Sequence, residues 1–195
     1  MRLALFDFDG TITTKDSMFE FIRYAVGTPR YYMGLMLLAP MLSAYILKLI
    51  PSYRAKEMLL SYFFRGYSRD KFIDVATRYS LEQIDHIVRP KAIKKIKFHQ
   101  DRGDRIIIVS ASIECWLIGW CQSNHIELIS TKLLFLDGKF SGRLEGKNCY
   151  GMEKVNRLNE IVDLDEFDHI YAYGDSLGDI EMLKISDESH YRPFR

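Results

Sequence analysis

The sequence predicts an α/β protein in which a parallel sheet is interrupted by a long all-helical segment. Short apolar runs at residues 3–6, 106–109 and 169–173 are each followed by small or acidic residues. Such runs are typical of parallel strands that are buried on both faces. Residues 16–89, between the first two runs, show only helical spacing of their apolar side chains. We therefore expect an α/β core made of residues 1–15 and 90–195, with residues 16–89 as a helical insert.

Composition favours an ordinary globular chain. Of the 195 residues 48% are hydrophobic and 27% charged, and 27 Lys and Arg against 26 Asp and Glu leave a formal net charge of +1. This balance argues against a nucleic-acid partner, which usually demands a clear basic excess. The three cysteines include no CxxC pair, which excludes a disulfide framework and favours a reducing compartment. The N-terminus does not resemble a signal peptide, so we expect a cytoplasmic protein.

The first strand ends in two carboxylates. Asp7 and Asp9 follow the apolar run 3–6, and Gly10 then breaks the strand. Because strand side chains alternate, both aspartates leave the chain on the same side. Ligands of open α/β sheets bind at the carboxyl ends of the strands, and paired carboxylates at that place suit Mg²⁺. Solvated acids in a glycine turn are the ordinary alternative.

The helical insert contains an unusual uncharged stretch. Asp16 or Ser17 can cap its first helix, and no charged residue then occurs from 31 through 47. Pro40 divides residues 31–50 into two short helices, which argues against a membrane span of about 20 residues. We expect a helical hairpin that is buried or forms an interface, such as a homo-oligomer contact through 31–50. Contact with a membrane surface is a less favoured alternative.

The remaining elements follow the same rules. A helix is expected over 90–102 with Ile93 and Ile96 inward, another over 113–123, and a hairpin whose turn is Asp137-Gly138. A further helix over 151–161 is predicted to bury four apolar side chains at helical spacing, those of Met152, Val155, Leu158 and Ile161.

Polar and acidic residues gather after three of the predicted strands. The segments are DFDGT at 7–11, VSAS at 109–112 and GDSLGD at 174–179, and Lys154 lies in GMEKVNRL before the last of them. Taken singly, each has an ordinary structural explanation, such as a helix cap, a solvated lysine or a turn. In this order the four segments resemble the motifs of the haloacid dehalogenase superfamily. The resemblance extends over essentially the whole chain and is greatest for the phosphoserine-phosphatase-like branch, which carries a helical cap between its first two motifs.

The resemblance implies a Rossmann-like core with an inserted helical cap, and it implies roles for individual residues. Asp7 would be the nucleophile that forms an aspartyl-phosphate, and Asp9 would act as general acid and base. Ser110, backbone N–H groups near Ala111 at a helix start, and Lys154 would bind the phosphate.

The resemblance also implies a metal site. Asp7, Asp175 and the backbone carbonyl of Asp9 would bind Mg²⁺, and Asp179 would support it. Four carboxylates and one lysine leave a charge of about −3 before a phosphate dianion arrives, so a cation is needed.

The expected function is therefore Mg²⁺-dependent hydrolysis of a small phosphomonoester. Phosphoserine is one alternative substrate. In phosphoserine phosphatases a cap Glu and a cap Arg hold the amino acid, whereas here those places fall at Asp16 and near Leu60. The apolar stretch suggests instead a substrate with an apolar, lipid-like alcohol, since each buried methylene contributes about 0.8 kcal/mol. A catalytically silent module that binds phosphate or a membrane surface is the alternative from another class.

Overall fold

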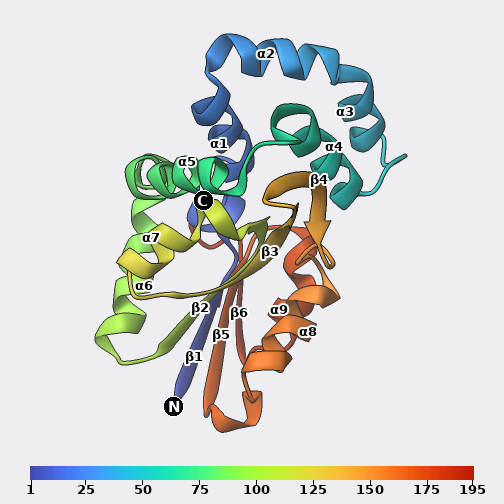
Figure 1. Cartoon of the computed structure of the whole chain (residues 1–195). Coiled ribbons are helices and arrows are strands. Elements are labelled where there is room, and N and C mark those ends of the chain that lie inside the picture. The colour runs from blue at the N-terminus through green and yellow to red at the C-terminus, as the bar shows by residue number, and fades with distance from the viewer.

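The computed structural model describes all residues 1–195, which form a six-stranded sheet with helices on both faces (Figure 1). The strand order is β4-β3-β2-β1-β5-β6. The bounds are β1 Arg2–Phe6, β2 Arg105–Ile113, β3 Glu127–Leu136, β4 Lys139–Glu145, β5 His169–Gly174 and β6 Glu188–Tyr191. All neighbouring pairs are parallel except β3 and β4. The predicted α/β class is thereby confirmed, and β1 lies centrally, where the strand order reverses direction.

Alternation along β1 divides the core into two layers. Ala4 and Phe6 belong to one buried cluster and Leu3 and Leu5 to the other. The second cluster includes side chains of α8 (Met152–Ile161) and α9 (Ile180–Lys184). The first includes side chains of α6 (Pro90–Asp101) and α7 (Ile118–Ser123) and continues without interruption into the helices that follow β1. Both faces of β1 are therefore covered, which explains its continuous apolar run.

Five α-helices lie between β1 and α6, which leads into β2. They are α1 Ser17–Val26, α2 Thr28–Leu37, α3 Ala39–Ile46, α4 Ser52–Phe64 and α5 Arg69–Glu82. Pro40 lies in the first turn of α3, so the predicted break between two short helices is confirmed. Figure 1 shows α2 and α3 along the outer edge of this group, on the side away from the sheet, while α4 lies beside β4. None of the helices is both long and apolar enough to cross a bilayer.

Several sequence predictions require correction. The helix predicted over 113–123 is instead a short 3₁₀ turn, Glu114–Trp116, followed by α7. Met152 and Ile161 are exposed although Val155 and Leu158 are buried, and Ile93 is also exposed. The buried apolar face of α8 is thus shorter than its pattern suggests, because the apolar residues of its first and last turns lie in solvent. The predicted hairpin at Asp137-Gly138 is confirmed, with both turn residues at positive φ.

Candidate active site

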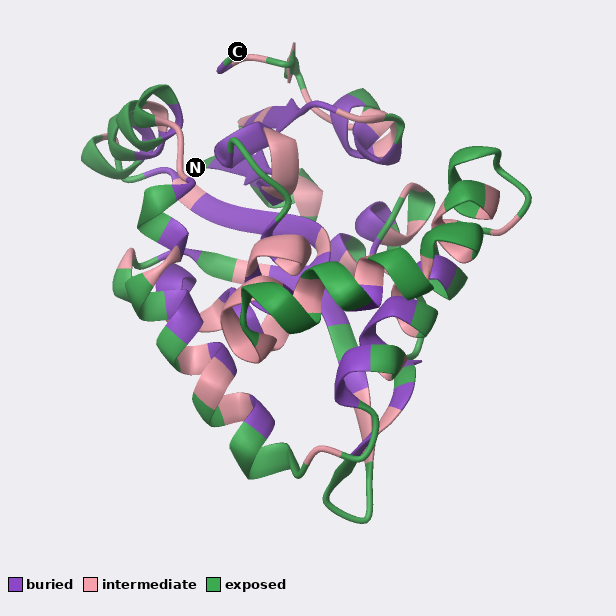
Figure 2. Cartoon of the chain, turned by 90° about the horizontal axis from the view of Figure 1, so that it is seen from above, coloured by how far each residue is buried: buried purple, intermediate pink, exposed green.

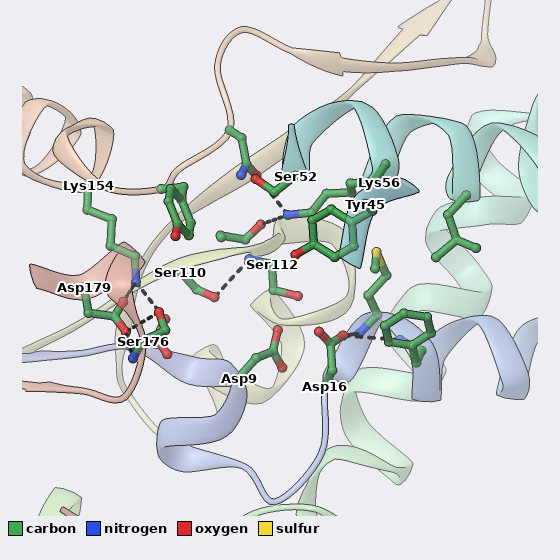
Figure 3. Close-up of a pocket in the computed structure, with 18 of the residues that line it drawn as sticks. Asp9, Asp16, Tyr45, Ser52, Lys56, Ser110, Ser112, Lys154, Ser176 and Asp179 are labelled. Atoms are coloured by element: carbon green, nitrogen blue, oxygen red, sulfur yellow. Dashed lines mark hydrogen bonds and ion pairs between the residues drawn. The ribbon is translucent and has the colours of Figure 1, made fainter. Parts of the chain in front are cut away.

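The carboxyl ends of β1, β2 and β5 surround one cavity of about 300 Å³ (Figure 3). Asp7 follows β1, Ser110 lies in β2, and Asp175 follows β5. Helices α1, α3 and α4 form the opposite wall. The polar and charged side chains that line the cavity are those of Asp7, Asp9, Asp16, Ser52, Lys56, Ser110, Ser112, Asn148, Lys154, Ser176 and Asp179. Segments far apart in sequence therefore meet where open α/β sheets bind their ligands.

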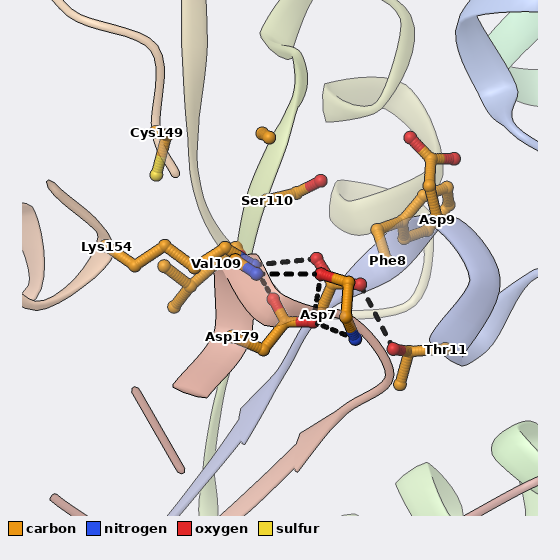
Figure 4. A network of polar contacts seen from close by, with 12 residues as sticks. Asp7, Phe8, Asp9, Thr11, Val109, Ser110, Cys149, Lys154 and Asp179 are labelled. Carbon is orange, nitrogen blue, oxygen red and sulfur yellow. Dashed lines mark hydrogen bonds and ion pairs between the residues drawn. The ribbon is translucent and has the colours of Figure 1, made fainter. Parts of the chain in front are cut away.

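Lys154 holds two of the carboxylates together (Figure 4). Its buried ammonium donates to Asp7 Oδ1 at 2.7 Å, to Asp179 Oδ1 at 2.7 Å and to the Val109 carbonyl at 2.6 Å. Burial alone lowers the pKa of Lys154, but Asp7 and Asp179 outweigh it and raise that pKa above its ordinary value. Lys154 is therefore a permanent cation at the base of the cavity.

Asp7 is a buried acid whose pKa is raised by burial more than it is lowered by Lys154. Burial raises the pKa of Asp7 to about 6 even though the nearby Lys154 ammonium lowers it. Its second oxygen, Oδ2, accepts a hydrogen bond from the Thr11 hydroxyl at 3.0 Å. The contacts with Lys154 and Thr11 therefore fix the orientation of the Asp7 carboxylate, which lines the cavity.

Asp9 lies on the cap side of the cavity and is held separately. The Ser17 backbone N–H donates to Asp9 Oδ1 at 2.7 Å, and the Ser17 hydroxyl lies 3.1 Å from Oδ2. Ser17 is in turn bonded to the Ser112 hydroxyl at 2.7 Å, and Trp116 Nε1 donates to both hydroxyls. Burial raises the pKa of Asp9 to about 8. At neutral pH its carboxyl is thus mainly protonated, which is the form that can give a proton.

Three carboxylates offer a site for a divalent cation. One oxygen from each of Asp7, Asp175 and Asp179 lies within 4.8 Å of the others. Gly10, at φ +81°, makes room for this arrangement, because a Cβ at that position would lie 2.7 Å from an Asp175 oxygen. A buried cluster of hard oxygen donors fits Mg²⁺. The Asp9 carboxylate is not part of this group, so only its backbone carbonyl remains for the role in metal binding expected from the sequence.

The surroundings of these carboxylates differ. Both oxygens of Asp179 are already engaged, Oδ1 by Lys154 and Oδ2 by the Ser176 hydroxyl and the N–H groups of residues 175 and 176. Asp175 instead pairs with Arg195. The charge of about −3 expected from the sequence did not include this cation. Asp175 Oδ1 also accepts from the Thr11 hydroxyl at 3.4 Å, so both oxygens of Asp175, like those of Asp179, have protein partners.

The expected phosphate-binding residues lie on the cavity wall, but one detail of the prediction is wrong. Ser110 and Ala111 line the cavity. However, Ala111 belongs to β2, where the pairing with β3 shifts register between Ser110 and Ile113, and not to the start of a helix. The Ser110 hydroxyl accepts a hydrogen bond from the Ser112 N–H at 3.0 Å. A bulged strand therefore presents this segment to the cavity.

The two residues suggested for substrate choice have different environments. Asp16 lines the cavity and caps α1, since its Oδ1 accepts from the Met18 N–H at 2.9 Å. Leu60 is fully buried among the apolar side chains of the helical insert and does not line the cavity. Its neighbours on α4, Lys56 and Leu59, line it instead.

Lys56 is the functional candidate that the sequence analysis missed. Its ammonium donates to the Ala111 carbonyl and to Asn148 Oδ1 at 2.8 Å, and Figure 3 shows it extending from α4 into the cavity. Burial lowers the pKa of Lys56 to about 8. Its position between Ala55 and Leu59 on a largely apolar helix was the available signal, because a solvated lysine needs no such neighbours.

Comparison with known proteins agrees with this site. The family described as haloacid dehalogenase-like hydrolase matches residues 4–184, so the chain belongs to that family. Among its relatives is protein CicA of Caulobacter vibrioides, which is 34% identical over 195 residues that cover 99% of this chain and 86% of CicA.

Solved structures share the fold. A protein of unknown function from Bordetella pertussis Tohama I superposes with a TM-score of 0.84 at 22% identity, covering 96% of this chain and 88% of its own. A phosphoserine phosphatase, solved as a phospho-aspartyl intermediate analogue, superposes with a TM-score of 0.67 at 19% identity, covering 96% of this chain and 84% of its own. The fold is thus that of the phosphoserine-phosphatase-like branch.

Proposed function

We propose that this hydrolase is a Mg²⁺-dependent phosphomonoester phosphatase that acts through an aspartyl-phosphate on Asp7. Residues 1–15 and 90–195 would form its catalytic core, and residues 16–89 its cap. The observation that carries the proposal is the pairing of Asp7 with the buried Lys154 at 2.7 Å, in a cavity that Asp9 also lines.

In the first step an Asp7 carboxylate oxygen forms a bond to phosphorus while the bond from phosphorus to the alcohol oxygen breaks. Asp9 gives its proton to that leaving oxygen. In the second step a water oxygen attacks the phosphorus, Asp9 takes the water's proton, and the Asp7 carboxylate is released. Ser110 donates a hydrogen bond to the phosphoryl oxygens. The Lys154 ammonium offsets their charge, and it would exchange one of its three contacts, to Asp7, Asp179 or Val109, in order to donate to them.

The carboxylates of Asp7 and Asp175 and the backbone carbonyl of Asp9 would hold Mg²⁺, with Asp179 in support. When bound, the cation offsets the negative charge that phosphate and carboxylates bring together. The cavity is lined by Asp7, Asp9, Asp16 and Asp179 against Lys56 and Lys154. Without the cation, this excess of carboxylates would repel a phosphate dianion that enters the cavity.

We further propose a substrate whose alcohol is apolar. The cap wall of the cavity includes Asp16, Ser52 and Lys56, but most of its residues have apolar or aromatic side chains: Met18, Phe19, Leu42, Tyr45, Ala55 and Leu59. Burying an unpaired ammonium or carboxylate against such a wall costs free energy, whereas burying methylenes is favourable.

Phosphoserine is the second candidate, and one observation favours it. Asp16 and Lys56 give the cavity wall one acid and one base, which could pair with an ammonium and a carboxylate. Both groups already have protein partners, however: Asp16 caps α1, and Lys56 donates to Asn148. Phosphoserine would have to compete with these contacts.

A substrate series separates the two candidates. With Mg²⁺ present, kcat/KM is measured for phosphoserine and for alkyl phosphates of increasing chain length. We expect kcat/KM to rise with chain length and to exceed the value for phosphoserine. If kcat/KM does not change with chain length and is clearly highest for phosphoserine, the apolar wall serves packing and does not select the substrate.

A separate experiment tests whether the protein is a Mg²⁺-dependent phosphatase. Hydrolysis of an aryl phosphate should require Mg²⁺ and disappear on chelation, and Asp175→Ala should raise the Mg²⁺ concentration needed for half-maximal rate. Unchanged activity in excess chelator would refute the metal requirement. Absence of any hydrolysis with Mg²⁺ would instead favour a silent phosphate-binding module.

A further inference from the structure

The outer face of α2 and α3 leaves large apolar side chains in solvent. We call this surface the cap tip; its residues are Tyr32, Met33, Met36, Leu37, Ile46, Leu47 and Leu49. Met36, Ile46, Leu47 and Leu49 are between 69% and 74% exposed. In Figure 2, which looks down on the helical insert, helices on the near side show long exposed stretches in green. Contiguous exposed apolar surfaces of this kind mark interaction sites.

The cap tip is fixed in place from beneath. Gly34, on the opposite face of α2, is buried, and a Cβ there would lie 2.3 Å from the Phe63 ring of α4. Tyr32 and Met36, each two positions from Gly34, lie on the opposite side of α2 and point outward. These side chains are therefore exposed because the opposite face of α2 packs tightly on α4, and not because the segment is loosely held.

The charged residues of the segment that carries the cap tip are all basic. Between Glu20 and Glu57 the chain contains no acidic residue. Arg30 at the start of α2, Lys48 after α3 and Arg54 in the first turn of α4 are all exposed. A second copy of this chain would bring the same cations to the shared surface without an acidic partner, which costs free energy. An anionic lipid surface would satisfy both the cations and the apolar side chains.

The cap tip is continuous with the cavity. Leu42 and Tyr45 of α3 line the cavity, and Ile46 and Leu47 follow directly in the cap tip. Tyr45 is itself exposed, so it reaches both regions. A cavity of about 300 Å³ accommodates a headgroup but not whole acyl chains. The chains of a lipid would therefore stay outside, where the cap tip lies.

We propose that the cap tip inserts into the interface of an anionic membrane and places the cavity mouth at the level of the lipid headgroups. Docking itself depends only on the surface just described. The consequence that phosphomonoester headgroups enter the cavity from the membrane rests on the function proposed above.

The test measures co-sedimentation of the full chain with vesicles, without any turnover. Vesicles of phosphatidylcholine with phosphatidylglycerol are compared with vesicles of phosphatidylcholine alone. We expect binding to the anionic vesicles, weakened by high salt. The double variant Met36→Glu/Leu47→Glu should lose about tenfold or more in affinity, and Lys48→Glu about fivefold or more. Ile161→Glu, at a 55% exposed apolar residue of α8, is the matched control and should bind as the wild type does.

Three results would overturn the proposal. One is equal sedimentation with and without vesicles, and another is wild-type binding by the double variant. The third is a dimer in analytical ultracentrifugation that the double variant dissociates, which would assign the cap tip to self-association. Thermal melting and hydrolysis of a soluble aryl phosphate, both unchanged in the variants, show that folding and the active site are intact. Vesicle binding without hydrolysis of any phosphomonoester would refute the proposed function and leave the docking supported.

Discussion

The cavity and the cap tip satisfy opposite physical demands, although α3 contributes residues to both. At the cavity, buried acids and bases are matched group by group, as with Lys154 between Asp7 and Asp179. The only buried side-chain polar atoms without a hydrogen-bond partner belong to Ser130, His169 and His190, none of which lines the cavity. At the cap tip, apolar side chains expose more than half of their surface to solvent. The polar groups of the cavity thus have partners within the chain, and only the proposed Mg²⁺ and substrate come from outside, whereas the cap tip presents apolar side chains to solvent.

The same contrast exists between neighbouring helices. Phe63 and Phe64 of α4 are buried, while Met36 and Leu37 of α2 are exposed, although both segments are strongly apolar in sequence. Helix α4 lies between α2 and β4 and so has neighbours on two sides. Helix α2 lies at the outer edge and has them on one side only (Figure 1). Position in the fold, and not composition, decides which apolar run becomes core.

The largest effect on turnover is expected at Asp7, the carboxylate that pairs with Lys154. Asp7→Asn should reduce turnover about ten-thousandfold or more, because the nucleophile is removed. Burial raises the pKa of Asp7 to about 6, so the folded state disfavours its ionised form and tolerates a neutral amide there. The melting temperature should accordingly change little. Rates come from a phosphate-release assay and folding from circular dichroism. Substantial turnover by pure Asp7→Asn would remove Asp7 from the nucleophile role.

The second effect concerns proton transfer. Asp9→Asn should slow hydrolysis of alkyl phosphates by about a hundredfold or more, and that of activated aryl phosphates much less, since a general acid matters most for poor leaving groups. The measurement compares kcat for the two substrate types. Equal losses for both would show that Asp9 has a positional role instead.

A third effect depends on pH. Burial lowers the pKa of Lys56 to about 8, so its ammonium loses its proton as the pH rises through that value. We expect KM for the phosphate substrate to be lowest below about pH 8 and to rise above it. Lys56→Met should raise KM about tenfold at neutral pH and abolish this pH dependence. Lys56→Arg, which stays charged, should restore low KM at high pH. A wild-type KM that is constant from pH 6 to 10 would contradict the prediction.

The smallest effect is expected at the cap tip. Phe63→Ala should lower the free energy of unfolding by about 3–5 kcal/mol, because it leaves a cavity in the core. Ile46→Ser, at a residue that is mostly exposed, should change it by less than about 0.5 kcal/mol. Urea unfolding measures both. A large loss for Ile46→Ser would mean that the cap tip supports the fold and is not reserved for an external partner.

Local signals in the sequence were sufficient for much of the active site. Asp7 follows a buried strand, Asp16 precedes a helix as a cap, and Asp137-Gly138 forms a tight turn; each depends on residues only a few positions apart. These predictions succeed because helix capping and turn geometry are short-range properties of the chain. The prediction that strand alternation places Asp7 and Asp9 on one side is wrong, because β1 ends at Phe6 and Asp9 lies in a short π-helix over Phe8–Ile12. The early part of β3, by contrast, was overlooked, because its burial comes from pairing with β2 and not from a distinct local pattern.

The sequence by itself determined the α/β class, the helical insert and the acidic strand ends, since these follow from periodicity and residue type. Only the tertiary structure decided that Lys56, and not a residue near Leu60, reaches the cavity, and that Arg195 pairs with Asp175. It also decided that the apolar face of α2 and α3 points to solvent. These outcomes depend on the rotation of each helix about its axis and on contacts between distant segments, neither of which a local pattern specifies.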